Sequence, residues 1–375
     1  MKDQLFTIGQ ELKNQLCEIS DFMYHNPELG NKEYKAAEKL TSFLRAHNFS
    51  VECPVLGIET AFVATYDSKK PGPSIAFICE YDALPEIGHA CGHNMIGAMS
   101  TGAGIILSKV LNEIGGKIYV FGAPAEETDG AKVTMAAAGL FKGIDAALIV
   151  HPSANTRESG TSAAMEALQF SYKGQTAHAA GCPEDGINAL NAVIQLFNGI
   201  DALRQHVTSD VRMHGIISKG GVAANIVPEE AVARFYLRSA TKENLAIVKD
   251  KVLKIAEGAA LITGATVEIE NYEYSNDNMI TNATLSEAYN KNLRDLGITE
   301  ILEPHKGAGS SDMGNVSHVV PSAHPYIGIS ETPLTGHTRE FADATITEFA
   351  HDRLLVAALA MAYTGFDILV GDVTL

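Results

Sequence analysis

The stretch Ser74–Glu80, SIAFICE, is almost entirely apolar, and the polar run YDALPEIGHACGHN follows it at 81–94. A short, continuous apolar run indicates a strand that is buried on both faces, as in a sheet covered by helices on each side. Similar runs occur at 117–121 and 145–150, and segments with helical patterns lie between them. This alternation of strands and helices predicts an α/β layered domain with a sheet flanked by helices.

The helices and strands around this sheet can be predicted from apolar spacing. Leu and Ile recur every three to four residues over 5–23, which predicts an amphipathic helix, and a second helix is expected over 32–46. Near the C-terminus we expect a helix over 286–296 and a strand over 323–329. A closing helix is expected after the capping box Thr345-x-x-Glu348.

The middle of the chain has a different order of elements. Strands are predicted at 166–172, 212–218, 231–238 and 266–272, with helices at 189–204 and 242–262. The resulting order, βαββαβ, is typical of a ferredoxin-like unit. We therefore expect a first domain formed by 1–165 and 276–375, and a second domain, 166–275, inserted into it.

Composition excludes several classes of protein. The 375 residues are 46% hydrophobic and 19% charged, which favours folded domains over disorder. Lys plus Arg is 28 and Asp plus Glu is 45, so the net charge of −17 argues against nucleic acid or anionic membranes as partners. No secretory signal is visible, and the most apolar stretch, around 354–366, is too short to span a bilayer. The five cysteines do not form a disulfide framework, and we expect a cytoplasmic protein.

Candidate chemical groups follow the predicted strands of the α/β domain. Carboxyl ends of parallel strands meet at one edge of a sheet, where ligands bind in such folds. The residues expected to meet there are Asp82, Cys91, His93, Glu126, Glu127, His151 and His337.

These residue types suit a metal centre. Thiolate, imidazole and carboxylate are ligands of zinc-like ions, and five of them exceed what one tetrahedral zinc needs, which indicates a two-metal site with a bridging water. One carboxylate of the pair Glu126–Glu127 can bind metal while the other acts as general base. Simpler interpretations remain open: Cys91 as a packed thiol beside a capping histidine, the acidic pair as a solvated helix start, and His151 as a hydrogen-bonded core residue.

Several ordered motifs carry a resemblance that spans nearly the whole chain. They are HNPELG at 25–30, EYDALPEIGHACGHN at 80–94, PAEE at 124–127, HP at 151–152, AHAAGCPEDGINAL from Ala177, GGVAANIVPEEA from Gly220, GAGSSDMGNVSHVVP from Gly307 and GHT from Gly336. The sequence resembles the metal-dependent aminoacylase and carboxypeptidase family of amidohydrolases, peptidase clan MH. The similar branch holds indole-acetyl-amino-acid hydrolases and p-aminobenzoyl-glutamate hydrolase.

The resemblance implies a role for each matching residue. It implies two divalent ions per subunit, zinc, manganese or cobalt, with ligands Cys91, His93, Glu127, His151 and His337. It also implies Glu126 as the base and Asp82 as a support of the metal site.

The resemblance further implies that the inserted domain is a lid that makes a homodimer. In the lid, His178 would stabilise the oxyanion, in its own subunit or across the dimer, and Asn225 and Arg238 would bind substrate together with Gly309 in the loop 307–311. The alternatives are that His178 caps a turn and that Arg238 is a surface cation paired with Glu230.

Two positions depart from the family pattern. Glu80 stands where many members have histidine, so the first metal must depend on Cys91. Asn94 replaces an aspartate, which favours the aminobenzoyl-glutamate branch.

We expect a metal-dependent hydrolase of amide bonds in small N-acyl amino acids or aminobenzoyl-glutamate-like compounds. The alternatives are a dipeptidase or aminopeptidase of the same family, a hydrolase with Cys91 as nucleophile, and a non-catalytic metal-binding or metabolite-binding protein.

Overall fold

The computed structural model describes residues 1–304 and 309–375, and these residues form two compact units. The first unit comprises 1–161, 279–304 and 312–375, and the second comprises 162–278 and 309–311. The predicted insertion, 166–275, lies inside the second unit. Gly307, at the start of one of the motifs, lies outside the described residues.

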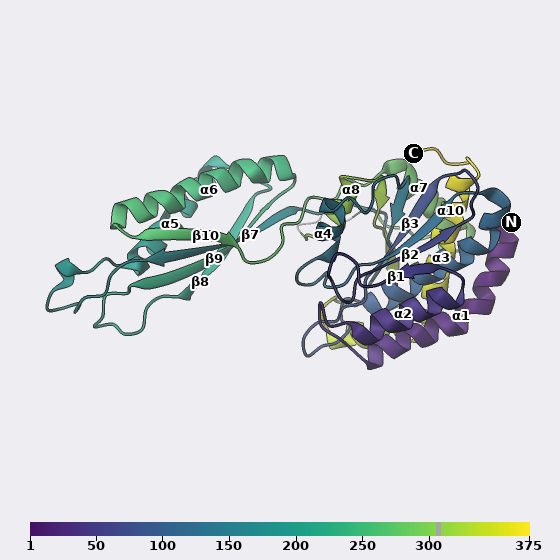
Figure 1. Cartoon of the computed structure of the whole chain (residues 1–375), viewed down its shortest axis with the longest axis horizontal. Helices are drawn as coiled ribbons and strands as arrows, with labels where there is room; N and C mark the ends of the chain where they lie inside the picture. The colour runs from purple at the N-terminus through teal and green to yellow at the C-terminus, as the bar shows by residue number, and fades with distance from the viewer. Residues whose placement is uncertain (305–308) are drawn as a thin grey trace. The chain divides into compact units, whose positions relative to one another are not determined.

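The first unit is built on a mixed six-stranded sheet with the order β1-β2-β4-β3-β5-β11 (Figure 1). β2 is antiparallel to β1 and to β4, whereas β4, β3, β5 and β11 run parallel. A separate parallel pair is formed by β6 and β12. The strands are β1 (Ser50–Glu52), β2 (Phe62–Asp67), β3 (Ser74–Cys79), β4 (Lys117–Gly122), β5 (Ala146–Leu148), β6 (His151–Ser153), β11 (Ser322–Ala323) and β12 (Tyr326–Gly328).

Helices cover this sheet, and the central one, α3, packs against α1, α10 and strands β3 and β4. The helices are α1 (Lys2–His25), α2 (Tyr34–Ala46), α3 (His93–Ile114), α4 (Ala131–Ala137), α7 (Ala283–Asp295), α8 (Met313–Ser317), α9 (Arg339–Ala344) and α10 (Glu348–Leu369). The long periodic segments were therefore predicted correctly as helices.

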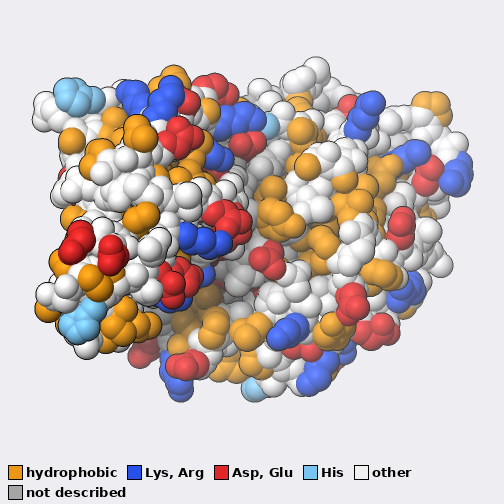
Figure 2. All heavy atoms as spheres, turned by 60° about the vertical axis from the view of Figure 1, so that its left-hand side comes forward, with side chains coloured by type: hydrophobic (Ala, Val, Ile, Leu, Met, Phe, Trp, Pro, Cys, Tyr) orange, Lys and Arg blue, Asp and Glu red, His pale blue; other side chains and the backbone are white. Residues whose placement is uncertain are grey.

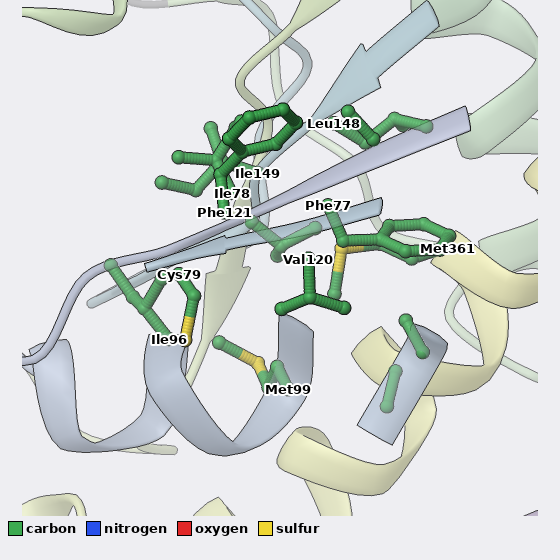
Figure 3. Packing of buried hydrophobic residues seen from close by; sticks show 14 of the residues in the cluster. Phe77, Ile78, Cys79, Ile96, Met99, Val120, Phe121, Leu148, Ile149 and Met361 are labelled. Carbon is green, nitrogen blue, oxygen red and sulfur yellow. The ribbon is translucent and has the colours of Figure 1, made fainter. Parts of the chain in front are cut away.

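The apolar run of β3 is buried on both faces of the sheet, as predicted. Phe77 points toward Met361 of α10, and Cys79 lies beside α3 (Figure 3). Ile78 points to the opposite face, on the same side as Phe121 of the neighbouring strand (Figure 3). All four of these sheet side chains are at most 1% exposed, so alternation along the strand places apolar groups in two separate layers of core.

α3 is also the one helix within the described part of the chain that is long and apolar enough to cross a membrane. However, 94% of the most apolar window of α3 is buried inside the protein, as is typical of a core helix. The stretch 354–366, expected to be too short to span a bilayer, lies in α10 and does not meet this test. On the surface drawn in Figure 2, acidic and basic side chains are interspersed among apolar ones.

The second unit has the predicted order βαββαβ. Its antiparallel sheet has the order β10-β7-β9-β8, and α5 and α6 lie over one face of it (Figure 1). β8 and β10 form its edges. The elements are β7 (Ala164–Lys173), α5 (Ala189–Leu203), β8 (Arg212–Lys219), β9 (Glu230–Ser239), α6 (Lys242–Thr263) and β10 (Thr266–Asn271).

Two local predictions were wrong. The strand expected over 323–329 is divided into β11 and β12, because Pro325 between them has no backbone N–H and the chain passes from one sheet to another there. The capping box is also misplaced. Thr347, rather than Thr345, precedes α10, and its hydroxyl accepts a hydrogen bond from the N–H of Ala350 at 3.2 Å.

We predict that Thr347→Ala destabilises the first unit by about 1 kcal/mol, because it leaves a backbone donor in the first turn of α10 without its cap. Thr347→Ser should retain most of the stability, since serine caps equally well. Urea unfolding followed by a probe of the first unit provides the measurement. Equal unfolding midpoints for Thr347→Ala and the wild type would refute this assignment of the cap.

Candidate metal centre

Asp82 connects two of the segments that converge at this edge of the sheet. It follows β3 and is buried, and its carboxylate accepts hydrogen bonds from His93 Nδ1 at 2.9 Å and from the backbone N–H of Glu127 at 3.0 Å. Because Nδ1 of His93 donates its proton to Asp82, the lone pair of Nε2 is available to a metal ion. One carboxylate therefore orients an imidazole and anchors the acidic loop after β4.

Cys91 and His151 contact each other close to His93. The Sγ of Cys91 lies 3.4 Å from Nε2 of His151, and Nδ1 of His151 lies 2.7 Å from the carbonyl oxygen of Pro152. Burial, together with the nearby charge of His93, lowers the pKa of His151, which favours the neutral form that binds metals. Gly92 has φ 82°, and a Cβ there would lie 2.4 Å from Cγ of Pro152. Glycine is therefore required where this loop approaches Pro152.

Glu127 lies between His93 and His337. Its Oε1 is 4.0 Å from Nε2 of His93 and 3.6 Å from Nε2 of His337. The neighbouring Glu126 is half-buried, and burial together with the charges of Glu80 and Asp312 raises its pKa. The acidic pair does not start a helix, because α4 begins only at Ala131. That alternative is wrong.

The structure thus brings all five proposed ligands together. Three overlapping groups have donor atoms within 4.8 Å of one another: Cys91, His93 and His151; Cys91, Glu127 and His337; and His93, Glu126 and Glu127. Among the described residues, the buried atoms that lack a hydrogen-bond partner include Nε2 of His93 and Oε1 of Glu127. Such atoms are costly unless an ion satisfies them. The donor types and these free buried atoms both fit a pair of zinc-like divalent ions.

A pocket of about 400 Å³ opens beside these ligands in the first unit. Its lining combines the three ligands Cys91, His151 and His337 with the apolar rings of Phe341 and Tyr326. The size and mixture of apolar and polar groups suit a small molecule. Arg157 also lines this pocket and was not identified from the sequence.

The sequence analysis also missed a buried ion cluster next to the ligands. The ammonium group of Lys132 lies 2.7 Å from Glu80 and 2.6 Å from Asp312, and all three side chains are at most 1% exposed. Burial alone would lower the pKa of Lys132, but the charges of Asp312 and Glu80 outweigh it and raise the pKa. Glu80 and Asp312 stand in conspicuous motifs, whereas nothing in the pattern around Lys132 indicated a buried lysine.

His324 is a second buried group that had no signal in the sequence. Its ring packs at 5.7 Å from that of His151 and at 5.3 Å from that of Tyr326. Burial and the proximity of His151 lower its pKa to about 3, so the ring is neutral. Asn94, which had suggested one branch of the family, instead donates hydrogen bonds to Ser20 and Thr345 and joins α3 to α1.

The remaining predicted residues lie in the second unit. Nδ1 of His178 accepts hydrogen bonds from the N–H groups of Ala180 and Gly181, so the ring does cap a turn, and its Nε2 carries the proton in the neutral form. Arg238 donates a hydrogen bond to Ser310 at 2.8 Å.

The predicted substrate-binding residues Asn225 and Gly309 also lie in this unit. Asn225 is exposed, and the carbonyl of Gly309 accepts a hydrogen bond from Ala163. Glu230 pairs with Lys219, so the alternative pairing of Glu230 with Arg238 is wrong.

Comparisons with known proteins identify relatives of this chain. Residues 158–263 match the family model described as a peptidase dimerisation domain. The Xaa-Arg dipeptidase of Mus musculus is 36% identical over 96% of this chain and 86% of its own length. A subunit of the p-aminobenzoyl-glutamate hydrolase of Escherichia coli is 34% identical over 77% of this chain and 64% of its own length.

The fold has a counterpart among solved structures. The YXEP protein of Bacillus subtilis, described as a dinuclear metal binding peptidase from the M20 family, superposes with a TM-score of 0.72. The two sequences are 20% identical, and the match covers 96% of this chain and 99% of that one. Together with the extended identity to the dipeptidase, the match assigns this chain to the M20 family of peptidases and amidohydrolases, which hydrolyse amide bonds.

Proposed function

We propose that this M20 hydrolase cleaves the amide bond of a small N-acyl amino acid or of an aminobenzoyl-glutamate-like compound, with two divalent ions at the centre described above. The observation that carries the proposal is the meeting of five donor groups, from four separate segments of the chain, around Glu126 and beside a small-molecule pocket. The p-aminobenzoyl-glutamate hydrolase and the indole-3-acetyl-aspartic acid hydrolase among the relatives support this substrate class.

The ions would be held by Cys91, His93, Glu127, His151 and His337. When bound, they would polarise the scissile carbonyl and lower the pKa of the attacking water toward about 7. Zinc, manganese and cobalt all suit this mixture of sulfur, nitrogen and oxygen donors. Asp82 and the carbonyl of Pro152 hold His93 and His151 with their Nε2 atoms facing the centre.

Glu126 moves the proton in the proposed reaction. Its carboxylate accepts a proton from the attacking water and then delivers it to the nitrogen of the leaving amine. Because Glu127 is fixed through its backbone to Asp82, the adjacent Glu126 can stay uncoordinated while Glu127 acts as a ligand.

We assign the remaining binding roles to the second unit. His178 would donate a hydrogen bond from Nε2 to the oxyanion, which agrees with the acceptor role of its Nδ1. Asn225, Arg238 and Gly309 would bind the carboxylate or carbonyl of the substrate. This assignment applies whether His178 serves its own subunit or a partner.

A dipeptidase activity is the second candidate, because two Xaa-Arg dipeptidases are 36% and 34% identical over 96% of this chain and a dipeptidase also cleaves an amide bond. Mass spectrometry separates the two activities. It measures which compounds the metal-loaded protein hydrolyses in a mixed panel of acyl amino acids, aminobenzoyl-glutamate and dipeptides. A cysteine hydrolase is disfavoured, because burial raises the pKa of the Cys91 thiol and a nucleophilic cysteine needs its thiolate.

We also infer a cytoplasmic homodimer that forms through the second unit. β8 is an edge strand whose Ile216 and Ile217 are 63% and 44% exposed, and apolar edges of this kind tend to pair with another strand. The match to a dimerisation domain spans this strand.

For catalysis, we predict that Glu126→Gln lowers kcat by about 10²–10⁴-fold, because the amide cannot accept the proton of the water. The bound metal, measured by plasma mass spectrometry, should be unchanged. Glu113→Gln, at the exposed C-terminal end of α3, is the matched control and should leave kcat as in the wild type. Normal turnover by Glu126→Gln would refute its role as the base.

For metal binding, we predict that Asp82→Asn weakens affinity by about 10–100-fold, because one of its two hydrogen bonds, to His93 or to Glu127, is lost. Competition with a fluorescent chelator gives the affinity. Asp145→Asn is the control, because this carboxylate precedes β5 and accepts a hydrogen bond from Ser74 instead of from a ligand segment. Unchanged affinity in Asp82→Asn would show that Asp82 does not orient the ligands.

For assembly, we predict that the double substitution Ile216→Lys and Ile217→Lys yields monomers, because charges on β8 would oppose strand pairing. Ile247→Lys, on the exposed face of α6 and 57% exposed, should stay dimeric. Light scattering after gel filtration measures the mass. A dimer that survives in the double variant would place the interface elsewhere.

A further inference from the structure

A separate group, made of acidic side chains alone, lies beside the proposed metal pair. Glu80 and Asp312 are buried, Glu126 is half-buried, and donor atoms of all three lie within 4.8 Å of one another. None of the described ligand groups around Cys91 includes Glu80 or Asp312. By donor type and spacing alone, these three carboxylates would suit a hard divalent cation such as Mn²⁺ or Mg²⁺.

The ammonium group of Lys132 already pairs with two of these three carboxylates. Its Nζ lies 2.7 Å from Oε1 of Glu80 and 2.6 Å from Oδ1 of Asp312, and its side chain is 0% exposed. The backbone N–H of the same lysine donates to Oδ2 of Asp312 at 3.1 Å. The carboxylate of Asp312 therefore binds both the backbone N–H and the ammonium group of Lys132. These two contacts hold the start of α4 against the start of α8.

A lysine ammonium differs from a free metal ion, because it is covalently attached to the chain. It places a positive charge beside the buried carboxylates, but it offers no coordination position and cannot exchange with solvent. A cation bound to a carboxylate stabilises its ionised form, so the carboxylate becomes a weaker base. A divalent ion among Glu80, Glu126 and Asp312 would therefore weaken Glu126 as a general base.

We propose that Lys132 is an internal cation that fills the cage formed by the carboxylates of Glu80, Glu126 and Asp312 beside the metal pair, and so keeps Glu126 free of metal. The cage itself needs no assumption about the reaction, whereas the protection of Glu126 rests on the proposed function. Removal of the ammonium group without filling its space opens the cage to one divalent ion.

The test compares two substitutions of Lys132. Lys132→Ala removes the charge and vacates the space, whereas Lys132→Met removes the charge and fills the space with an apolar chain of similar length. Each full-length variant is loaded with Mn²⁺ alone and gel-filtered, and its manganese content is counted by plasma mass spectrometry. Lys132→Ala should hold one more ion per chain than the wild type and Lys132→Met.

Thermal unfolding provides a second readout on the same proteins. Mn²⁺ should raise the Tm of Lys132→Ala by more than that of the wild type, because binding to the native state alone stabilises it. The Tm of Lys132→Met should show no extra shift. Equal manganese contents and equal Mn²⁺-induced shifts in all three proteins would overturn the proposal.

The three carboxylates of Lys132→Ala could repel one another enough to prevent folding. In that case Glu80→Gln is added to both substitutions, so that Glu126 and Asp312 still face the vacated space. The alanine version must again hold one more ion than the methionine version, and equal contents overturn the proposal. A wild-type enzyme inactive on every amide would refute the proposed function but leave these ion counts unaffected.

Discussion

The carboxylate of Asp82 is the contact on which the geometry of the centre depends. It is buried at the end of β3, and it accepts one hydrogen bond from the first residue of α3 and another from the loop after β4. Two segments that are distant in sequence are thereby fixed to one side chain. Since β3 and β4 are parallel neighbours, their carboxyl ends lie side by side, and a short aspartate is sufficient to join the loops that leave them.

The rest of the fold supports this contact through apolar layers. β3 has buried apolar side chains on both faces: Phe77 points toward Met361 of α10, and Ile78 points to the opposite face, on the same side as Phe121 (Figure 3). A shift of β3 by one residue would move each side chain to the opposite face, among different neighbours in a close-packed core. The position of Asp82, and through it those of His93 and Glu127, is therefore set by the core.

The sequence was informative where a pattern is continuous. Apolar runs predicted β3 and β4, and helical spacing predicted α1 and the helices of the second unit, because these elements bury regular stripes. The candidate ligands could be grouped because each follows a strand. The cap at Thr345 and the single strand over 323–329 were predicted incorrectly, since the cap of α10 and the division between β11 and β12 depend on how neighbouring loops pack. Lys132 could not be identified at all, because a lysine is buried only if distant carboxylates happen to surround it.

Positive φ angles occur in the loops that carry the ligands as well as elsewhere in the chain. Gly92, Ala125 and His337 all have positive φ, near 60–82°, and the two non-glycine residues are held there by hydrogen bonds of their own backbone N–H groups. The N–H of Ala125 donates to the buried carboxylate of Glu33, and that of His337 donates to the carbonyl of Ala90, both at 2.9 Å. Each of the two non-glycine positions costs about 1–3 kcal/mol, which the surrounding contacts must offset, whereas glycine adopts this conformation without strain. Because Ala125 precedes Glu126, His337 is itself a proposed ligand and Gly92 separates Cys91 from His93, these unusual backbone conformations lie where they orient the side chains of the centre.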